Sequence, residues 1–150
     1  MVYNLLNNCF FAKDVIMLTR KIAREQAFIL IFEKMFNDLP TNEIIDLAAS
    51  VRDFETDNYC ISVFNGVYEN IERIDGIISK NSNGWNISRI GKVALSVMRL
   101  ALYEILFRDD IPVNVSINEA VEICKKFAST EDAAFVNGIL GAAVKNIPAI

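Results

Sequence analysis

Three cationic side chains lie within five positions near the start of the chain, at Arg20, Lys21 and Arg24 in the stretch TRKIARE. On an α-helix they would share one sector about 100° wide. Cations in the first turn of a helix oppose its dipole, at a cost of a few tenths of a kcal/mol each. Such a cluster suits contacts with phosphate groups, and the alternative is an ordinary solvated helix surface.

The same helical sector changes character further along the chain. It continues through Phe28, Ile31 and Met35, with Phe32 at its edge, so a cationic surface becomes apolar within about two turns. A helix surface that is merely solvated stays polar for several turns. Either the first turn projects beyond the body of the protein, or this sector contacts a partner.

The composition excludes most kinds of catalytic site. The 150 residues include no histidine, which removes the commonest general base, the usual zinc ligand and every Ser–His or Cys–His pair. No glycine-rich phosphate-binding loop of the G-x-x-x-x-G-K type is present. Carboxylate or lysine chemistry remains open, but we expect a protein that is not an enzyme and holds no metal or cofactor.

Charge and cysteine content limit which ligands and which cellular compartment the sequence fits. A formal net charge of −4 argues against coating nucleic acid over the whole surface, so any anion-binding site must be local. The three cysteines, Cys9, Cys60 and Cys124, are far apart, which favours buried thiols in a reducing cytoplasm over disulfides. No apolar run reaches the length of about 18 residues that a membrane span needs.

The first residues, MVYNLLNNCFFAKDVIM, are too polar for a secretory signal peptide. Met17 directly precedes LTRKIARE and could be the physiological initiator, which would make residues 1–16 an upstream extension. A short extra helix packed on the body is the alternative. The domain proper then spans residues 17–150.

The remaining sequence predicts helices throughout. Its composition, 53% hydrophobic and 23% charged, suits one globular domain. Apolar residues recur at three- and four-residue spacing, and no alternating strand pattern is sustained. Thr41 and Ser116 are expected N-caps, Ser116 in a capping box with Glu119. We expect an all-α domain of six or seven helices in compact bundles, over residues 20–36, 41–51, 56–79, 88–107, 116–128 and from 130 or 131 onward.

Three stretches together resemble the NusB family of bacterial transcription antitermination factors. They are RKIAREQAF at 20–28, GKVALSVMRLALYEILFRDDIPVNVSINEAVEICKKFAS at 91–129 and FVNGIL at 135–140. Their order and spacing match the family over about residues 18–145. The resemblance implies a compact all-helical fold built as two small bundles.

The resemblance also implies a function. Members of this family bind boxA, a single-stranded element of ribosomal RNA leader transcripts, together with NusE, a small-subunit ribosomal protein. The pair joins elongating RNA polymerase and suppresses premature termination, without catalysis or a metal. The family's arginine-rich first helix contacts RNA, and this motif falls on Arg20, Lys21 and Arg24, although some members carry longer basic runs.

Further contacts are implied by the same resemblance. A second RNA surface would use cations at Arg89 and Lys92, and the side chains of Phe135 and Asn137 from FVNG. A core position is the alternative for Phe135, and Gly138 and Gly141 are expected to allow close helix packing. The expected NusE-binding residues are Phe32 and Glu131, the latter suiting a basic ribosomal protein.

Two other interpretations stay open. The thin basic turn and the acidic chain also fit a helical protein-interaction adaptor without significant RNA binding. Some family members self-associate through the surface that others use for RNA, so either a monomer or a homodimer is compatible with the sequence.

Overall fold

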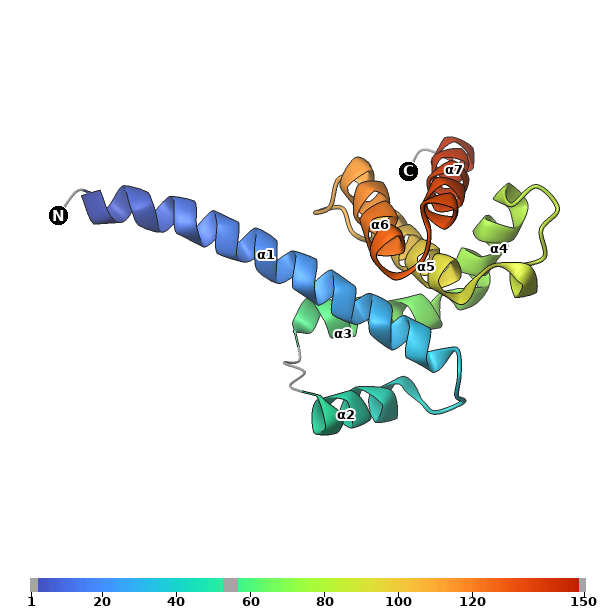
Figure 1. Ribbon diagram of the computed structural model, residues 1–150, viewed down its shortest axis with the longest axis horizontal. Helices are drawn as coiled ribbons and strands as arrows, with labels where there is room; N and C mark the ends of the chain where they lie inside the picture. The colour runs from blue at the N-terminus through green and yellow to red at the C-terminus, as the bar shows by residue number, and fades with distance from the viewer. Residues whose placement is uncertain (1–2, 53–56, 149–150) are drawn as a thin grey trace.

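The computed structural model describes the backbone of residues 3–52 and 57–148, and the side chains from residue 19 onward. These residues form seven α-helices and one short 3₁₀ helix, and they contain no strand (Figure 1). The all-α prediction is therefore confirmed. The helices are α1 Tyr3–Lys34, α2 Thr41–Val51, α3 Asn58–Glu69, α4 Ile71–Asn81, η1 Ile87–Arg89, α5 Lys92–Phe107, α6 Val113–Phe127 and α7 Thr130–Asn146.

Helix α5 lies at the centre of the fold. It packs against α1 and α3 and also against α4, α6 and α7. Its sequence, KVALSVMRLALYEILF, is apolar around most of its circumference, as a helix with neighbours on several sides must be. Helices α1 to α3 thus form one group and α4 to α7 another, with one continuous hydrophobic core between them.

Helix α1 is longer than the other helices and leaves the body. Residues 3–16, expected to be an upstream extension or a short separate helix, continue α1 without a break. Figure 1 shows this half of α1 directed away from the other helices. The apolar sector that follows the basic turn contacts the rest of this chain and needs no separate partner at Phe28 and Ile31, because both residues are buried in the core.

The predicted helix over residues 56–79 is wrong, because two helices meet at Asn70. The Asn70 side chain donates to the Gly66 carbonyl at 2.8 Å, and the Asn70 N–H donates to the carbonyls of Gly66 and Val67. A side-chain amide that takes a backbone partner in this way competes with continuation of the helix. Thr56, the expected start, lies outside the described residues. Asp57 caps α3 by accepting from the N–H groups of Tyr59 and Cys60.

The prediction of Ser116 as an N-cap is also wrong. Helix α6 begins at Val113, directly after Pro112, whose fixed φ already suits a helix start. Ser116 is therefore a residue of the helix interior, and it is buried. At α7 the expected start at residue 130 is confirmed, with Ser129 as N-cap accepting from the Asp132 N–H. The prediction of Thr41 as an N-cap is wrong too, because Thr41 is the first helical residue of α2 and the N-cap position is Pro40.

Two of the three cysteines can be placed, and both are buried free thiols, as expected. Burial raises the pKa of Cys60 to about 12 and that of Cys124 to about 11. The side chain of Cys9 lies outside the described ones. Both placed thiols are therefore neutral and hidden at physiological pH.

Close helix packing at Gly138 and Gly141 was expected and is wrong, because an added Cβ would meet no atom within 4 Å at either position. Gly66 on α3 is the tight position, since a Cβ there would overlap the ring of Tyr103 from α5. The close approach of α3 to α5 therefore depends on Gly66.

Gly66→Ala is expected to lower the free energy of unfolding by about 1–3 kcal/mol, because the Tyr103 ring must move away from its place. Gly76→Ala on α4 is the matched control, since nothing lies near its Cβ position. That substitution should raise stability by about 0.5–1 kcal/mol. Urea denaturation measures both, and a loss at Gly76 equal to that at Gly66 would contradict the packing argument.

Candidate nucleic-acid interface

Arg20 and Lys21 lie at the surface, on the part of α1 that enters the body. The Arg20 side chain is 38% exposed, and its guanidinium carbon lies 4.3 Å from the centroid of the Tyr59 ring on α3. Its Nη1 is 3.8 Å from Oδ2 of Asp110. Lys21 is exposed and faces α6. Both residues are thus available to an anionic partner.

Arg24 has a different position from the one expected. Only 3% of the residue is exposed, and its Nε–H donates to Oε1 of Glu104 at 2.8 Å. Its Nη1 lies 3.7 Å from Oε2 of Glu119 on α6. Burial opposes the positive charge, but the hydrogen bond and charge of Glu104 outweigh it and raise the pKa of Arg24. In this structure Arg24 binds acidic side chains inside the protein and leaves no surface for RNA.

Glu104 joins four helices through one carboxylate. The residue sits on α5 with no exposed surface. It accepts hydrogen bonds from Arg24 of α1, from the hydroxyl of Tyr59 of α3, and from Oγ of Ser116 of α6, the last at 2.7 Å. Burial and the neighbouring Glu104 charge raise the pKa of Tyr59, so its hydroxyl remains a donor. Glu119, expected to cap its own helix, instead faces Arg24.

Arg108 is a cation of this region that the sequence analysis did not select. It follows the last residue of α5, and its Nε–H and Nη2–H donate to the two carboxylate oxygens of Asp110, each at 2.8 Å. Its guanidinium carbon is 5.3 Å from the Tyr59 ring centroid. Arg108 holds the pKa of Asp110 at about 2, so this pair is ionised at any physiological pH. The place of Arg108 in the sequence, directly after the helix expected over residues 88–107, indicates only the end of that helix.

The expected second surface is divided between two parts of the fold. Arg89, on η1, and Lys92, in the first turn of α5, are both exposed, and Nζ of Lys92 lies 5.2 Å from the Phe36 ring. Trp85 is also exposed and lines a shallow hollow with Arg89. Residues of FVNG lie on α7 instead.

Asn137 and Phe135 differ in accessibility. Asn137 is exposed on α7, whereas Phe135 is half-buried and packs against the core. The neighbouring Gly138 leaves the helix backbone open beside Asn137. Asn137 can therefore reach a ligand directly, and Phe135 can offer at most part of its ring.

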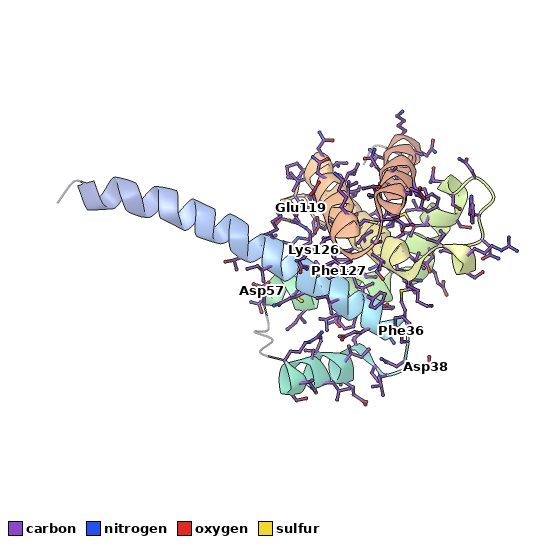
Figure 2. All side chains as sticks on the ribbon, viewed as in Figure 1. Phe36, Asp38, Asp57, Glu119, Lys126 and Phe127 are labelled. Carbon is purple, nitrogen blue, oxygen red and sulfur yellow. The ribbon has the colours of Figure 1, made fainter. Side chains whose placement is uncertain are left out.

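The expected partner residues lie on separate helices. Phe32 of α1 is half-buried, with its ring centroid 5.0 Å from that of Phe36 in an edge-to-face arrangement. Figure 2 shows Phe36 at the end of α1, where it is 61% exposed. Glu131 is exposed in the first turn of α7. Phe36 was not selected from the sequence, although the apolar sector of α1 leads directly to it.

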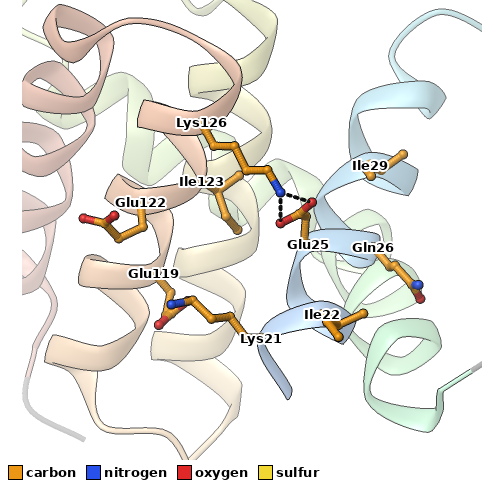
Figure 3. Close-up of a pocket in the computed structure, with 9 residues that line it drawn as sticks. All are labelled: Lys21, Ile22, Glu25, Gln26, Ile29, Glu119, Glu122, Ile123 and Lys126. Carbon is orange, nitrogen blue, oxygen red and sulfur yellow. Dashed lines mark hydrogen bonds and ion pairs between the residues drawn. The ribbon is translucent and has the colours of Figure 1, made fainter. Parts of the chain in front are cut away.

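A pocket of about 600 Å³ separates α1 from α6 next to Lys21. Figure 3 shows Lys126 of α6 reaching across to Glu25 of α1, with the ammonium 2.7 Å from Oε1. The lining of the pocket combines cations and carboxylates with the aliphatic side chains of Ile22, Ile29 and Ile123.

Among the residues that the structure describes, no three acidic or cysteine side chains are grouped to hold a metal ion. No helix in the described part of the chain could cross a membrane.

Comparison with known proteins agrees with this architecture. The family model described as "NusB family" matches residues 21–145. The transcription antitermination protein NusB of Acetivibrio thermocellus is 44% identical over 128 residues, which cover 84% of this chain and 88% of the relative. NusB of Bacillus subtilis is 39% identical over 121 residues, covering 81% and 91%.

Solved structures show the same fold. T. maritima NusB superimposes with a TM-score of 0.75 at 33% identity, over 85% of this chain and 91% of that one. A complex of the antitermination factors NusB and NusE with double-stranded RNA matches with a TM-score of 0.77 at 26% identity, over 86% and 98%. Fold and relatives together define an all-helical protein of the transcription antitermination class. The chain belongs to the NusB family.

Replacing Glu104 by Gln is expected to lower the free energy of unfolding by about 3–5 kcal/mol, because the buried Arg24 loses the carboxylate that its Nε–H binds and keeps only the more distant Glu119. Glu33→Gln breaks the exposed pair between Glu33 and Arg52 and should cost at most about 1 kcal/mol. Chemical denaturation compares the two variants. Equal losses would show that Glu104 does not hold the helices together.

Proposed function

We propose that this chain is a transcription antitermination factor that binds boxA-type single-stranded RNA together with NusE and modulates elongating RNA polymerase in the cytoplasm, without catalysis. The observation that carries the proposal is the pair of accessible cations, Arg20 and Lys21, at the base of the projecting helix in a member of the NusB family. The similarity to a chain in a NusB–NusE–RNA complex supports it.

The proposed RNA contacts follow from accessibility. Arg20 and Lys21 supply phosphate contacts, which set affinity and make it depend on salt. Arg89, Lys92 and Asn137 are further proposed contacts, since all three are exposed. Phe135 contributes through the exposed part of its ring. Arg24 acts from inside, because its bond to Glu104 orients the turn that carries Arg20.

The proposed NusE surface includes Phe32 and Glu131. The exposed Phe36 beside Phe32 adds the kind of aromatic surface that is enriched at protein interfaces. An acidic side chain at Glu131 complements a basic ribosomal protein and would mostly speed association. The domain proper is residues 17–150, with residues 1–16 as an extension, and a homodimer through the RNA surface is a further proposal.

The second candidate is a protein-interaction adaptor without significant RNA binding. The burial of Arg24 favours it, because only two of the three cations of the basic turn remain accessible. The two functions differ in what they require of RNA. An RNA factor prefers boxA over a scrambled sequence, whereas an adaptor has no such preference.

The double variant Arg20→Ala/Lys21→Ala is expected to bind boxA RNA more weakly than the parent protein. It should also show a shallower dependence of log K on log salt, by about 1.4 for two lost contacts at about 0.7 each. The matched control is Arg73→Ala/Lys80→Ala, which removes two exposed cations from α4. Fluorescence titration with boxA and scrambled RNA, with and without NusE, measures both. Absence of any boxA preference would contradict the RNA-binding function and favour the protein-interaction adaptor.

Arg24→Gln separates an internal role from a direct contact. We expect a lower free energy of unfolding, because Glu104 loses its counter-charge, but an unchanged salt slope for RNA binding by the folded variant. Binding is measured at a temperature where circular dichroism shows the variant folded. A slope that falls as much as in Lys21→Ala would show that Arg24 reaches phosphate.

A further inference from the structure

Three arginines surround one tyrosine ring at the base of α1. The guanidinium carbons of Arg20, Arg24 and Arg108 lie 4.3, 5.9 and 5.3 Å from the Tyr59 ring centroid. Tyr59 cannot turn away, because its hydroxyl is bonded to the buried Glu104. The electron-rich faces of aromatic rings attract guanidinium groups, so this ring gathers cations from two distant parts of the chain.

Two of these arginines reach the surface. Arg24 is occupied by Glu104, whereas the side chains of Arg20 and Arg108 are 38% and 21% exposed. Both face the same carboxylate, Asp110, whose side chain is 56% exposed. Arg108 binds it through two hydrogen bonds of 2.8 Å, and Arg20 stands 3.8 Å away. Lys21, the next residue on α1, is exposed as well.

The two-oxygen contact between Arg108 and Asp110 has the geometry of a phosphate contact. The planar fork of arginine binds carboxylate and phosphate oxygens in the same two-point manner. A carboxylate only two residues away from its arginine occupies that fork whenever no other anion is present. An RNA phosphodiester, like a carboxylate, shares one negative charge between two oxygens, and the neighbouring phosphates of the strand add to the attraction of Arg20 and Lys21, so it can take the place of this carboxylate.

We propose that Arg108 and Arg20 form one RNA phosphate-binding site, and that Asp110 is the internal carboxylate which the phosphate displaces. The proposal rests on the proposed function and adds Arg108 to it as a direct contact. Tyr59 is a positioning residue, since it holds both guanidinium groups from within the fold. Asp110 weakens RNA binding by competing for the same donors, so its removal strengthens binding.

A purely structural role for the Arg108–Asp110 pair predicts a different effect of removing Asp110. Arg108 ends α5, where its N–H donates to the Glu104 carbonyl, so the pair could simply fasten the turn between α5 and α6. In that case Asp110→Asn would loosen the turn and bring no gain in RNA affinity. The two roles are therefore separated by the sign of the effect of one substitution.

The test titrates boxA RNA at several salt concentrations with the parent protein, Arg108→Ala and Asp110→Asn. We expect Arg108→Ala to bind more weakly and to lower the salt slope by about 0.7. Asp110→Asn should bind about two- to fivefold more tightly, the range expected for releasing a surface ion pair. In an Arg20→Ala/Arg108→Ala background, Asp110→Asn should have no effect, because the donors it frees are gone.

The exposed pair Arg52–Glu33 supplies matched controls, since Nη1 of Arg52 lies 2.7 Å from Oε1 of Glu33 and the two side chains are 40% and 37% exposed. Arg52→Ala and Glu33→Gln should leave both affinity and slope unchanged. If the parent protein binds RNA but Arg108→Ala behaves like Arg52→Ala, or Asp110→Asn does not tighten binding, the inference is overturned while the proposed function stands. A parent protein with no RNA binding overturns both. Should Arg108→Ala fail to fold, Asp110→Asn decides the question alone.

Discussion

The buried carboxylate of Glu104 is the interaction on which the rest of the structure depends. A charge with no exposed surface is costly unless donors surround it, and here the donors come from three different helices. Arg24, Tyr59 and Ser116 must all lie within hydrogen-bond reach of α5 at once. This condition fixes how far α1 is rotated and where it stands along its axis, because only one register brings Arg24 to Glu104.

The register of α1 decides which cations remain outside. Arg20 and Arg24 are one helical turn apart and lie on the same side of α1, so both face Tyr59. Arg24 reaches past the ring to Glu104, whereas Arg20 stays over the ring at the surface. One tyrosine therefore separates a structural arginine from an accessible one. The same ring brings in Arg108 from the end of α5, although 88 positions separate it from Arg20 along the chain (108 − 20).

Much of the fold could be predicted because it depends on local periodicity. The spacing of apolar residues predicted most of the helices, but two of the expected ones are divided. The helix expected over residues 56–79 breaks at Asn70, whose amide donates to the Gly66 carbonyl, and the helix expected over residues 88–107 consists of η1 and, from Lys92, α5. The site was less predictable. A helical wheel gives the direction of Arg24 but not its neighbour, and its partner Glu104 lies 80 positions away in the sequence. Arg108 was missed for the same reason, since nothing near it in the chain indicates Tyr59.

The accessible cations around the basic turn are few, and this limits how the proposed function can operate. Arg20, Lys21 and Arg108 together would give three phosphate contacts, each of which contributes only modestly at physiological salt. Affinity for a particular RNA must then come from bases or from a bound partner. At the opposite end of the part of α1 that packs in the body, Phe32 lies on the helix and contacts Phe36, which follows the helix end at Lys34. The ammonium of Lys92 lies beside the Phe36 ring. Because α1 is one continuous helix, a protein bound at that end and an RNA bound at the basic turn would be held at a fixed separation. If the partner also binds the RNA, it would raise the effective concentration of the RNA at the basic turn without contacting that turn.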